Sequence, residues 1–132
     1  MKGLDTNVLV RYLVRDDQKQ ARKASSLINN VSSAGEFCYI NAIVLCELVW
    51  VLESAYSYSK KEIADVIDKI LVTRQFEVDR KDLVIHALRE YRQGKGDLAD
   101  YVIGRSNRAS GCDSTVTFDR ALRGCASFEL LD

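Results

Sequence analysis

Two aspartates at helical spacing are the residues of this chain that most directly suggest chemistry. Asp97 and Asp100 follow a Gly-Lys-Gly turn and stand three positions apart, so both side chains fall on one face of a predicted helix. Two like charges held side by side repel each other, and a cation between them relieves the repulsion. The pair also fits a capping box, with Asp97 as the N-cap and Asp100 as its N3 partner. The stretch alone leaves both interpretations open.

A single acid also interrupts an otherwise apolar run. Asn41 is a good N-cap for a helix over residues 42–56, in which Glu47 is surrounded by Ile, Val, Leu, Cys and Trp. A helix that is apolar nearly all round is typical of a buried helix. A buried carboxylate must be paired, protonated or bound to a metal ion. We therefore expect Glu47 to be buried, and either functional or bonded to a buried arginine or backbone amide.

The elements that must position these acids alternate along the chain. Short apolar or β-rich runs predict strands at residues 1–4, 36–40, 76–78, 114–118 and 128–131. Caps and helical spacing predict helices at residues 17–31, 42–56, 59–71, 79–91 and 97–111, with Asp17 and Ser59 as caps of the first and third, and a short helical turn at 121–122. Residues 8–14 could continue the first strand, but a helix capped by Asp5 or Thr6 is favoured. This order predicts one α/β domain, residues 1–132, whose parallel sheet has helices on both faces.

Two more acids follow predicted strands. Asp5 and Asp119 stand at carboxyl ends, the edge where open parallel sheets bind their ligands. We expect the acids to converge there. Carboxylates without histidine or thiolate partners make an all-oxygen site that suits Mg²⁺ or Mn²⁺. Without metal such a cluster repels itself, and some pKa values should rise. One ion, or two ions about 3.5–4 Å apart, would activate water and stabilise charge on a phosphoryl oxygen, so the natural substrate is a phosphodiester.

Composition excludes several other classes of protein. The chain has 132 residues, 47% hydrophobic residues and equal numbers of acidic and basic side chains. It has no apolar run near the roughly 20 residues that span a bilayer and no signal-peptide pattern, so we expect a cytoplasmic protein. The lone histidine, His86, argues against a zinc site or a Ser-His-Asp or Cys-His centre. The four cysteines form no C-x-x-C pair and are expected to be reduced.

Basic residues form three stretches. They are Arg15, Lys19, Arg22 and Lys23; Arg89, Arg92 and Lys95; and Arg105 and Arg108. Solvated helix surface is the favoured interpretation of each, with phosphate contact as the alternative.

Four segments, in order, resemble the acidic motifs of the PIN-domain family. They are Leu4–Val10, Cys46–Leu48, Gly96–Gly104 and Thr117–Asp119. Within that family the chain is most similar to the VapC-type ribonuclease toxins of bacterial toxin–antitoxin pairs. The segment over residues 110–115 departs from the family pattern, because it is more polar than a typical entry to the fourth strand.

The resemblance implies a three-layer α/β/α sandwich with a five-stranded parallel sheet, and Mg²⁺-dependent hydrolysis of RNA to a 5′-phosphate and a 3′-hydroxyl. Carried over by position, the expected acidic quartet is Asp5, Glu47, Asp100 and Asp119, with Asp97 as an extra acid that is a ligand, a support for the ligands or a cap. Thr6, Asn7 and Thr117 are the implied supporting polar groups. The family also implies a homodimer and a cognate antitoxin whose C-terminal segment blocks the site.

Three other functions compete with this one. A catalytically idle PIN domain that binds RNA or acts as a scaffold would have the same fold, but all four acids are present. A phosphoacceptor signalling domain also places acids at strand ends, yet the final strand leaves no room for the lysine it needs. A structure-specific DNA nuclease shares the acid cluster.

Overall fold

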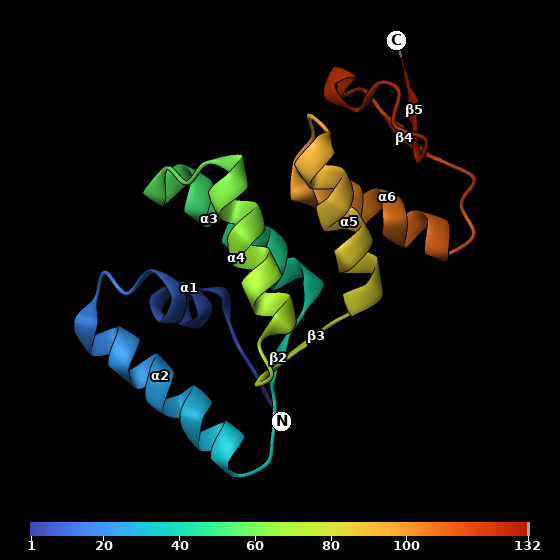
Figure 1. The fold of residues 1–132 in the computed structure, drawn as a ribbon. Helices are drawn as coiled ribbons and strands as arrows, with labels where there is room; N and C mark the ends of the chain where they lie inside the picture. The colour runs from blue at the N-terminus through green and yellow to red at the C-terminus, as the bar shows by residue number, and fades with distance from the viewer. Residues whose placement is uncertain (132) are drawn as a thin grey trace. The chain divides into compact units, whose positions relative to one another are not determined.

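The computed structural model describes residues 1–131 and divides the chain into two compact units, Met1–Lys81 and Asp82–Asp132 (Figure 1). The first unit contains three strands and four helices. In chain order they are β1 (Lys2–Gly3), α1 (Thr6–Val14), α2 (Gln18–Ser33), β2 (Cys38–Ile40), α3 (Ala42–Tyr56), α4 (Lys60–Val72) and β3 (Phe76–Val78).

The strands of the first unit form a parallel sheet in the order β1-β2-β3. Lys2 pairs with Cys38, and Cys38 pairs with Phe76 on its other side. Each connection between neighbouring strands contains two helices, which parallel pairing requires because the chain must cross back to the same end of the sheet. The order of these strands in the sheet follows their order in the sequence, and their parallel pairing agrees with the prediction from the alternation of strands and helices.

The helices of this unit begin where their caps predict. Asp5, Asn41 and Ser59 are the N-caps of α1, α3 and α4, and Ser59 forms a full capping box with Glu62. Asp17 caps α2 by accepting from the backbone N–H of Gln20 at 3.0 Å. Capping depends on neighbouring residues alone, which is why the sequence shows it directly.

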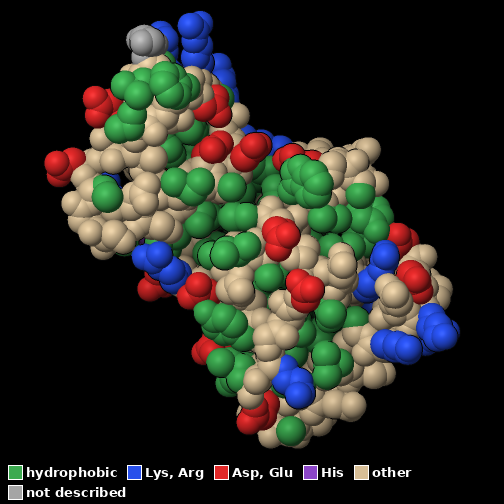
Figure 2. All heavy atoms as spheres, turned by 180° about the vertical axis from the view of Figure 1, so that it is seen from behind, with side chains coloured by type: hydrophobic (Ala, Val, Ile, Leu, Met, Phe, Trp, Pro, Cys, Tyr) green, Lys and Arg blue, Asp and Glu red, His purple; other side chains and the backbone are tan. Residues whose placement is uncertain are grey.

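Helix α3 corrects one prediction. Its inner face packs into the core of the unit through Val44, Leu45, Leu48, Val49 and Leu52. Its outer face is exposed although it is largely apolar, with Ile43 at 71% and Trp50 at 68% exposure. Hydrophobic side chains also reach the surface at several places on the face seen in Figure 2. A helix that is apolar all round was expected to be buried all round, and that expectation is wrong for the described structure.

The second unit contains α5 (Lys81–Gln93), which begins at the boundary, α6 (Leu98–Ala109), β4 (Thr115–Thr117), a 3-10 turn η1 (Arg120–Leu122) and β5 (Phe128–Leu130). Strands β4 and β5 pair in parallel, with Thr115 opposite Phe128. Ser110 is the C-cap of α6, and the next residue, Gly111, has a positive φ of 100°, which is typical of a glycine just after a helix.

The described strands form a three-stranded and a two-stranded parallel sheet. This confirms an α/β chain with parallel pairing. The finer predictions of one five-stranded sheet, a three-layer sandwich and a single domain over residues 1–132 stay predictions.

All four cysteines are free thiols, and burial raises the pKa of Cys38 and Cys46. Within residues 1–131 no helix is both long and apolar enough to cross a membrane.

Candidate active site

Asp5 stands at the carboxyl end of β1, where the chain turns into α1. Its side chain accepts a hydrogen bond from the backbone N–H of Thr6 at 2.8 Å, so the carboxylate is held over the first turn of the helix. A negative charge there is favourable because the helix N-terminus is the positive end of the helix dipole. Asp5 itself is exposed, which leaves its second oxygen open to solvent or to an ion.

Glu47 lies on the exposed face of α3, so the predicted burial of its carboxylate is wrong. The apolar residues beside it in sequence divide between the core and the outer face, and composition cannot tell these faces apart. Glu47 nevertheless has a specific partner. The hydroxyl of Thr6, a residue that is only 7% exposed, donates to Glu47 Oε1 at 3.0 Å. Thr6 therefore connects the start of α1 to the acid of α3, next to Asp5.

In the second unit, Asp97 is the N-cap of α6 and Asp100 reaches back to it. Asp100 Oδ2 accepts from the backbone N–H of Asp97 at 2.9 Å. The capping interpretation of this pair is therefore confirmed for Asp100. It does not displace the metal interpretation, because a carboxylate has two oxygens and several lone-pair sites, of which this bond takes one.

Asp100 is the acid with the clearest electrostatic strain. Burial raises its pKa, and the negative charges of Asp97 and Asp119 raise it further, against the opposing effect of the Asp97 N–H. Burial is the largest cause, and the smaller contribution of the two neighbouring acids has the direction expected for a carboxylate cluster without a cation. Asp97 and Asp119 thus both act electrostatically on Asp100 within a single unit.

Asp119 follows β4 and is held from both sides. Its side chain caps η1 by accepting from the backbone N–H of Ala121 at 2.9 Å, while its own N–H donates to the hydroxyl of Thr117 at 3.0 Å. Thr117, predicted as a supporting polar group, therefore fixes the backbone that carries the acid.

Sequence reasoning missed the contact that shapes the turn before Asp97. The backbone N–H of Gly96 donates to the hydroxyl of Tyr101 at 3.0 Å, and both residues are buried. A Cβ at Gly96 would lie 2.7 Å from Leu122 Cδ2 and 3.1 Å from Asp100 Oδ2, so a larger residue would force these side chains to move. The available signal was a tyrosine at the core-facing position of a helix that begins just after a glycine turn.

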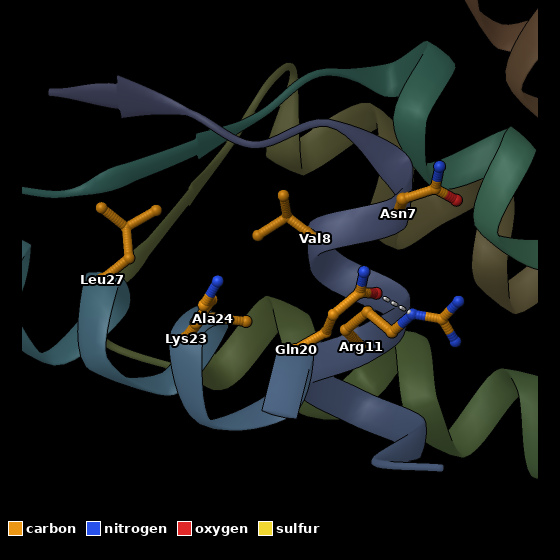
Figure 3. Close-up of a pocket in the computed structure, with 7 residues that line it drawn as sticks. All are labelled: Asn7, Val8, Arg11, Gln20, Lys23, Ala24 and Leu27. Carbon is orange, nitrogen blue, oxygen red and sulfur yellow. Dashed lines mark hydrogen bonds between the residues drawn. The ribbon is translucent and has the colours of Figure 1, made fainter. Parts of the chain in front are cut away.

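Asn7 is exposed and lies at the edge of a pocket, with its amide directed away from the other lining residues (Figure 3). It lines a pocket of about 320 Å³ between α1 and α2, together with Val8, Arg11, Gln20, Lys23, Ala24 and Leu27 (Figure 3). Arg11 Nε donates to Gln20 Oε1 at 2.6 Å across the two helices. Within residues 1–131 no hydrogen bond supports the role implied for Asn7 as a residue that holds the acids.

The five acids thus fall into two groups, Asp5 with Glu47 in the first unit and Asp97, Asp100 and Asp119 in the second. Within residues 1–131, no three His, Cys, Asp or Glu side chains are grouped so that they could hold a metal ion. The predicted convergence of all five stays a prediction. Chemically, both groups offer oxygen donors alone, and the second carries the mutual repulsion that a hard cation relieves.

Comparison with known proteins gives two matches that span most of the chain. The family model of the PIN domain matches residues 3–126. A protein of Aquifex aeolicus (strain VF5) described as a VapC ribonuclease is 28% identical over 123 residues, which is 93% of this chain and 90% of the relative.

Proposed function

Because the chain belongs to the PIN-domain family, we propose that it is a metal-dependent endoribonuclease and the toxin of a VapBC-type toxin–antitoxin pair. The observation that carries the proposal is the group of Asp97, Asp100 and Asp119, in which Asp100 contacts the backbone of Asp97, and burial first and then the charges of Asp97 and Asp119 raise the pKa of Asp100. Carboxylates with perturbed pKa values cluster at functional sites, and a bound cation relieves the repulsion between them. The near full-length similarity to a protein described as a VapC ribonuclease supports RNA as the substrate.

The proposed metal ligands are Asp5, Glu47, Asp97, Asp100 and Asp119. These residues fit Mg²⁺, with Mn²⁺ as a substitute, because all their donor atoms are carboxylate oxygens and Asp100 lies in a field of like charge. When bound, the metal would supply positive charge against the phosphoryl oxygens as negative charge develops on them. Asp5 and Asp100 are the central ligands of this assignment.

The neighbouring polar groups hold the acids in place. Thr6 donates to one oxygen of Glu47, which leaves the other for a ligand. Thr117 and the N–H of Ala121 hold Asp119 between them. In the proposed reaction a water oxygen attacks phosphorus, the bond from phosphorus to the 3′-oxygen breaks, and that oxygen takes a proton. The products are a 5′-phosphate and a 3′-hydroxyl.

The proposal includes two protein partners. One is an antitoxin, which the similarity to a protein described as a VapC ribonuclease supports, and whose C-terminal segment, as the family resemblance implies, would block the acids. The other is a second copy of the chain. The exposed apolar face of α3, with Ile43 and Trp50, supports a homodimer because a monomer gains nothing from two large apolar side chains in water. We place the protein in the cytoplasm, where its RNA substrate is found.

Cleavage of a mixed cellular RNA pool tests the function directly. Purified protein, freed of antitoxin by unfolding and refolding, is incubated with Mg²⁺ or with chelator beside an Asp100→Asn variant. We expect cuts that need Mg²⁺, that carry 5′-phosphate ends and that disappear in the variant. Binding of the pool without metal-dependent cleavage would refute the nuclease in favour of the idle PIN domain. Equal cleavage of single-stranded DNA would refute the assignment of RNA as the substrate.

A further inference from the structure

The second unit contains a basic pocket close in sequence to its acids. The pocket has a volume of about 540 Å³ and is formed by the turn between α5 and α6, by Tyr101 of α6 and by the segment from η1 to β5. Its residues are Glu90, Gln93, Gly94, Lys95, Tyr101, Arg120, Ala121, Arg123, Gly124, Cys125 and Ala126. All of them belong to the one unit. A volume of this size is typical of small-ligand sites in proteins, about 300–1,000 Å³.

The charge of this pocket is positive. Lys95, Arg120 and Arg123 are exposed and line it, and Glu90 is its one acid. Glu90 is already neutralised, because Oε1 accepts from Arg105 Nε at 2.7 Å and Oε2 accepts from the thiol of Cys125 at 3.8 Å. Among residues 1–131, neither Lys95 nor Arg120 has an ion pair or a side-chain hydrogen bond. Two unpaired cations therefore remain for a ligand.

Tyr101 forms part of the pocket lining and packs closely against the backbone of the turn before α6. Tyr101 is 4% exposed, and its hydroxyl is held by the Gly96 N–H at 3.0 Å. A Cβ at Gly94 would lie 1.9 Å from that hydroxyl, so only a glycine lets the turn pack over the tyrosine. The turn that carries Lys95 is thus fixed by the same tyrosine that fixes the turn before Asp97.

The cations and the candidate acids alternate along the same two segments. Lys95 precedes Asp97 by two residues, and Arg120 follows Asp119 directly. A polyanionic strand is repelled by carboxylates, so the phosphates next to the one being cut need cations close to the acids. Lys and Arg are the side chains that supply such phosphate contacts.

We propose that this pocket binds the phosphate and sugar of a nucleotide that adjoins the scissile bond of single-stranded RNA, with Lys95 and Arg120 as the phosphate contacts. The inference rests on the proposed ribonuclease function and deepens it. It changes the interpretation of Lys95, which the sequence favoured as solvated surface, and it adds Arg120, which belonged to none of the predicted basic stretches.

RNA binding measured in chelator tests the pocket independently of metal-dependent cleavage. The full chain is titrated into a fluorescent single-stranded RNA oligonucleotide, and anisotropy gives Kd over a range of salt concentrations. Lys95→Gln and Arg120→Gln are compared with Arg89→Gln, which removes the same charge from the exposed surface of α5 outside the pocket. All three sites are exposed, so the variants should melt like the wild type.

We expect each pocket variant to raise Kd several-fold at low salt and to reduce the slope of log K against log salt by about 0.7, the value for one phosphate contact on a single strand. Arg89→Gln should match the wild type in both. Pocket variants that bind RNA like Arg89→Gln would overturn the proposal, as would variants that lose antitoxin binding alone, since that result points to a protein ligand.

A cleavage assay on the same proteins tells the two proposals apart. With Mg²⁺, the pocket variants should raise KM while kcat stays near that of the wild type, because they weaken binding without removing a metal ligand. Wild-type protein that binds RNA through the pocket but never cleaves would refute the nuclease and leave the pocket standing. Wild-type protein that cleaves, beside pocket variants that bind normally, would refute the pocket and leave the nuclease standing.

Discussion

Replacing Tyr101 with phenylalanine removes one buried hydroxyl group, which is a hydrogen-bond acceptor, from the second unit. The hydroxyl of Tyr101 accepts the Gly96 N–H at 3.0 Å, and both residues are buried. Phenylalanine keeps the ring in the core but leaves that N–H without an acceptor. A buried donor without a partner costs about 1–3 kcal/mol of folding free energy.

The cost is large enough to measure by thermal melting. Unfolding entropy near 60 °C is about 2.1 cal/mol/K per residue, so a chain of this length loses about 4 °C of Tm per kcal/mol. Tyr101→Phe should therefore melt about 4–11 °C below the wild type. Cleavage should also fall at temperatures well below Tm, because the freed turn leads directly into Asp97.

Tyr12→Phe is the matched control. The ring of Tyr12 packs edge-on against Phe76 with centroids 5.9 Å apart, and within residues 1–131 its hydroxyl makes no hydrogen bond. The same chemical change there should alter stability by no more than about 0.5 kcal/mol. If Tyr101→Phe and Tyr12→Phe melt together, the bond between Tyr101 and Gly96 does not stabilise the turn and the reasoning fails.

The remaining predictions concern the acids and one tight glycine. Asp5→Asn and Asp100→Asn should each abolish metal-dependent RNA cleavage while the circular dichroism spectrum stays that of the wild type, because asparagine keeps the volume and the cap acceptor; persistent cleavage by both would contradict the assigned ligands. Thr6→Val should weaken Mg²⁺ binding in a calorimetric titration, because Glu47 loses the donor that orients it; unchanged affinity would argue against that role. In chelator, the folded-state pKa of Asp100 is raised, so its stabilising contribution is complete below the ordinary carboxyl pKa and is lost as pH rises through the folded value. Urea unfolding should accordingly show Asp100→Asn gaining in stability relative to the wild type as pH rises above about 4, the ordinary carboxyl pKa, whereas a constant difference would contradict the pKa direction. Gly104→Ala places a methyl group 2.8 Å from Cε2 of Phe128 in β5. It should lower the free energy of unfolding by about 1–3 kcal/mol in the same assay, whereas wild-type stability would mean that the Phe128 ring moves freely.

Local chemistry explains why so much of the fold was predictable. Asp5, Asn41 and Ser59 cap the helices that follow them because capping needs only a side-chain oxygen and the next few amides. Turn glycines and short β-rich runs are equally local signals. Element order and parallel pairing followed from these signals without long-range information.

The features that sequence reasoning missed depend on segments far apart in the chain. The exposure of Glu47 depends on which side of α3 meets the core, and apolar composition is the same on both sides. The basic pocket combines a turn at residues 93–95 with a segment at 120–126. The residue types of the candidate site come from the resemblance and stay a prediction, and the assembly of these residues depends on long-range placement that no local pattern encodes.

Three candidate metal ligands of this chain also cap helices or turns, and this second role has a genetic consequence. Asp5, Asp100 and Asp119 each accept a backbone N–H at the start of a helix or turn. Asparagine offers the same acceptor oxygen, and one base change in the codon converts aspartate to asparagine. Under selection against the proposed toxin, alleles with these single changes would therefore encode silenced proteins that still fold. On the proposed function such proteins would still bind the antitoxin, so a silenced copy of the gene would leave less antitoxin for an active copy in the same cell.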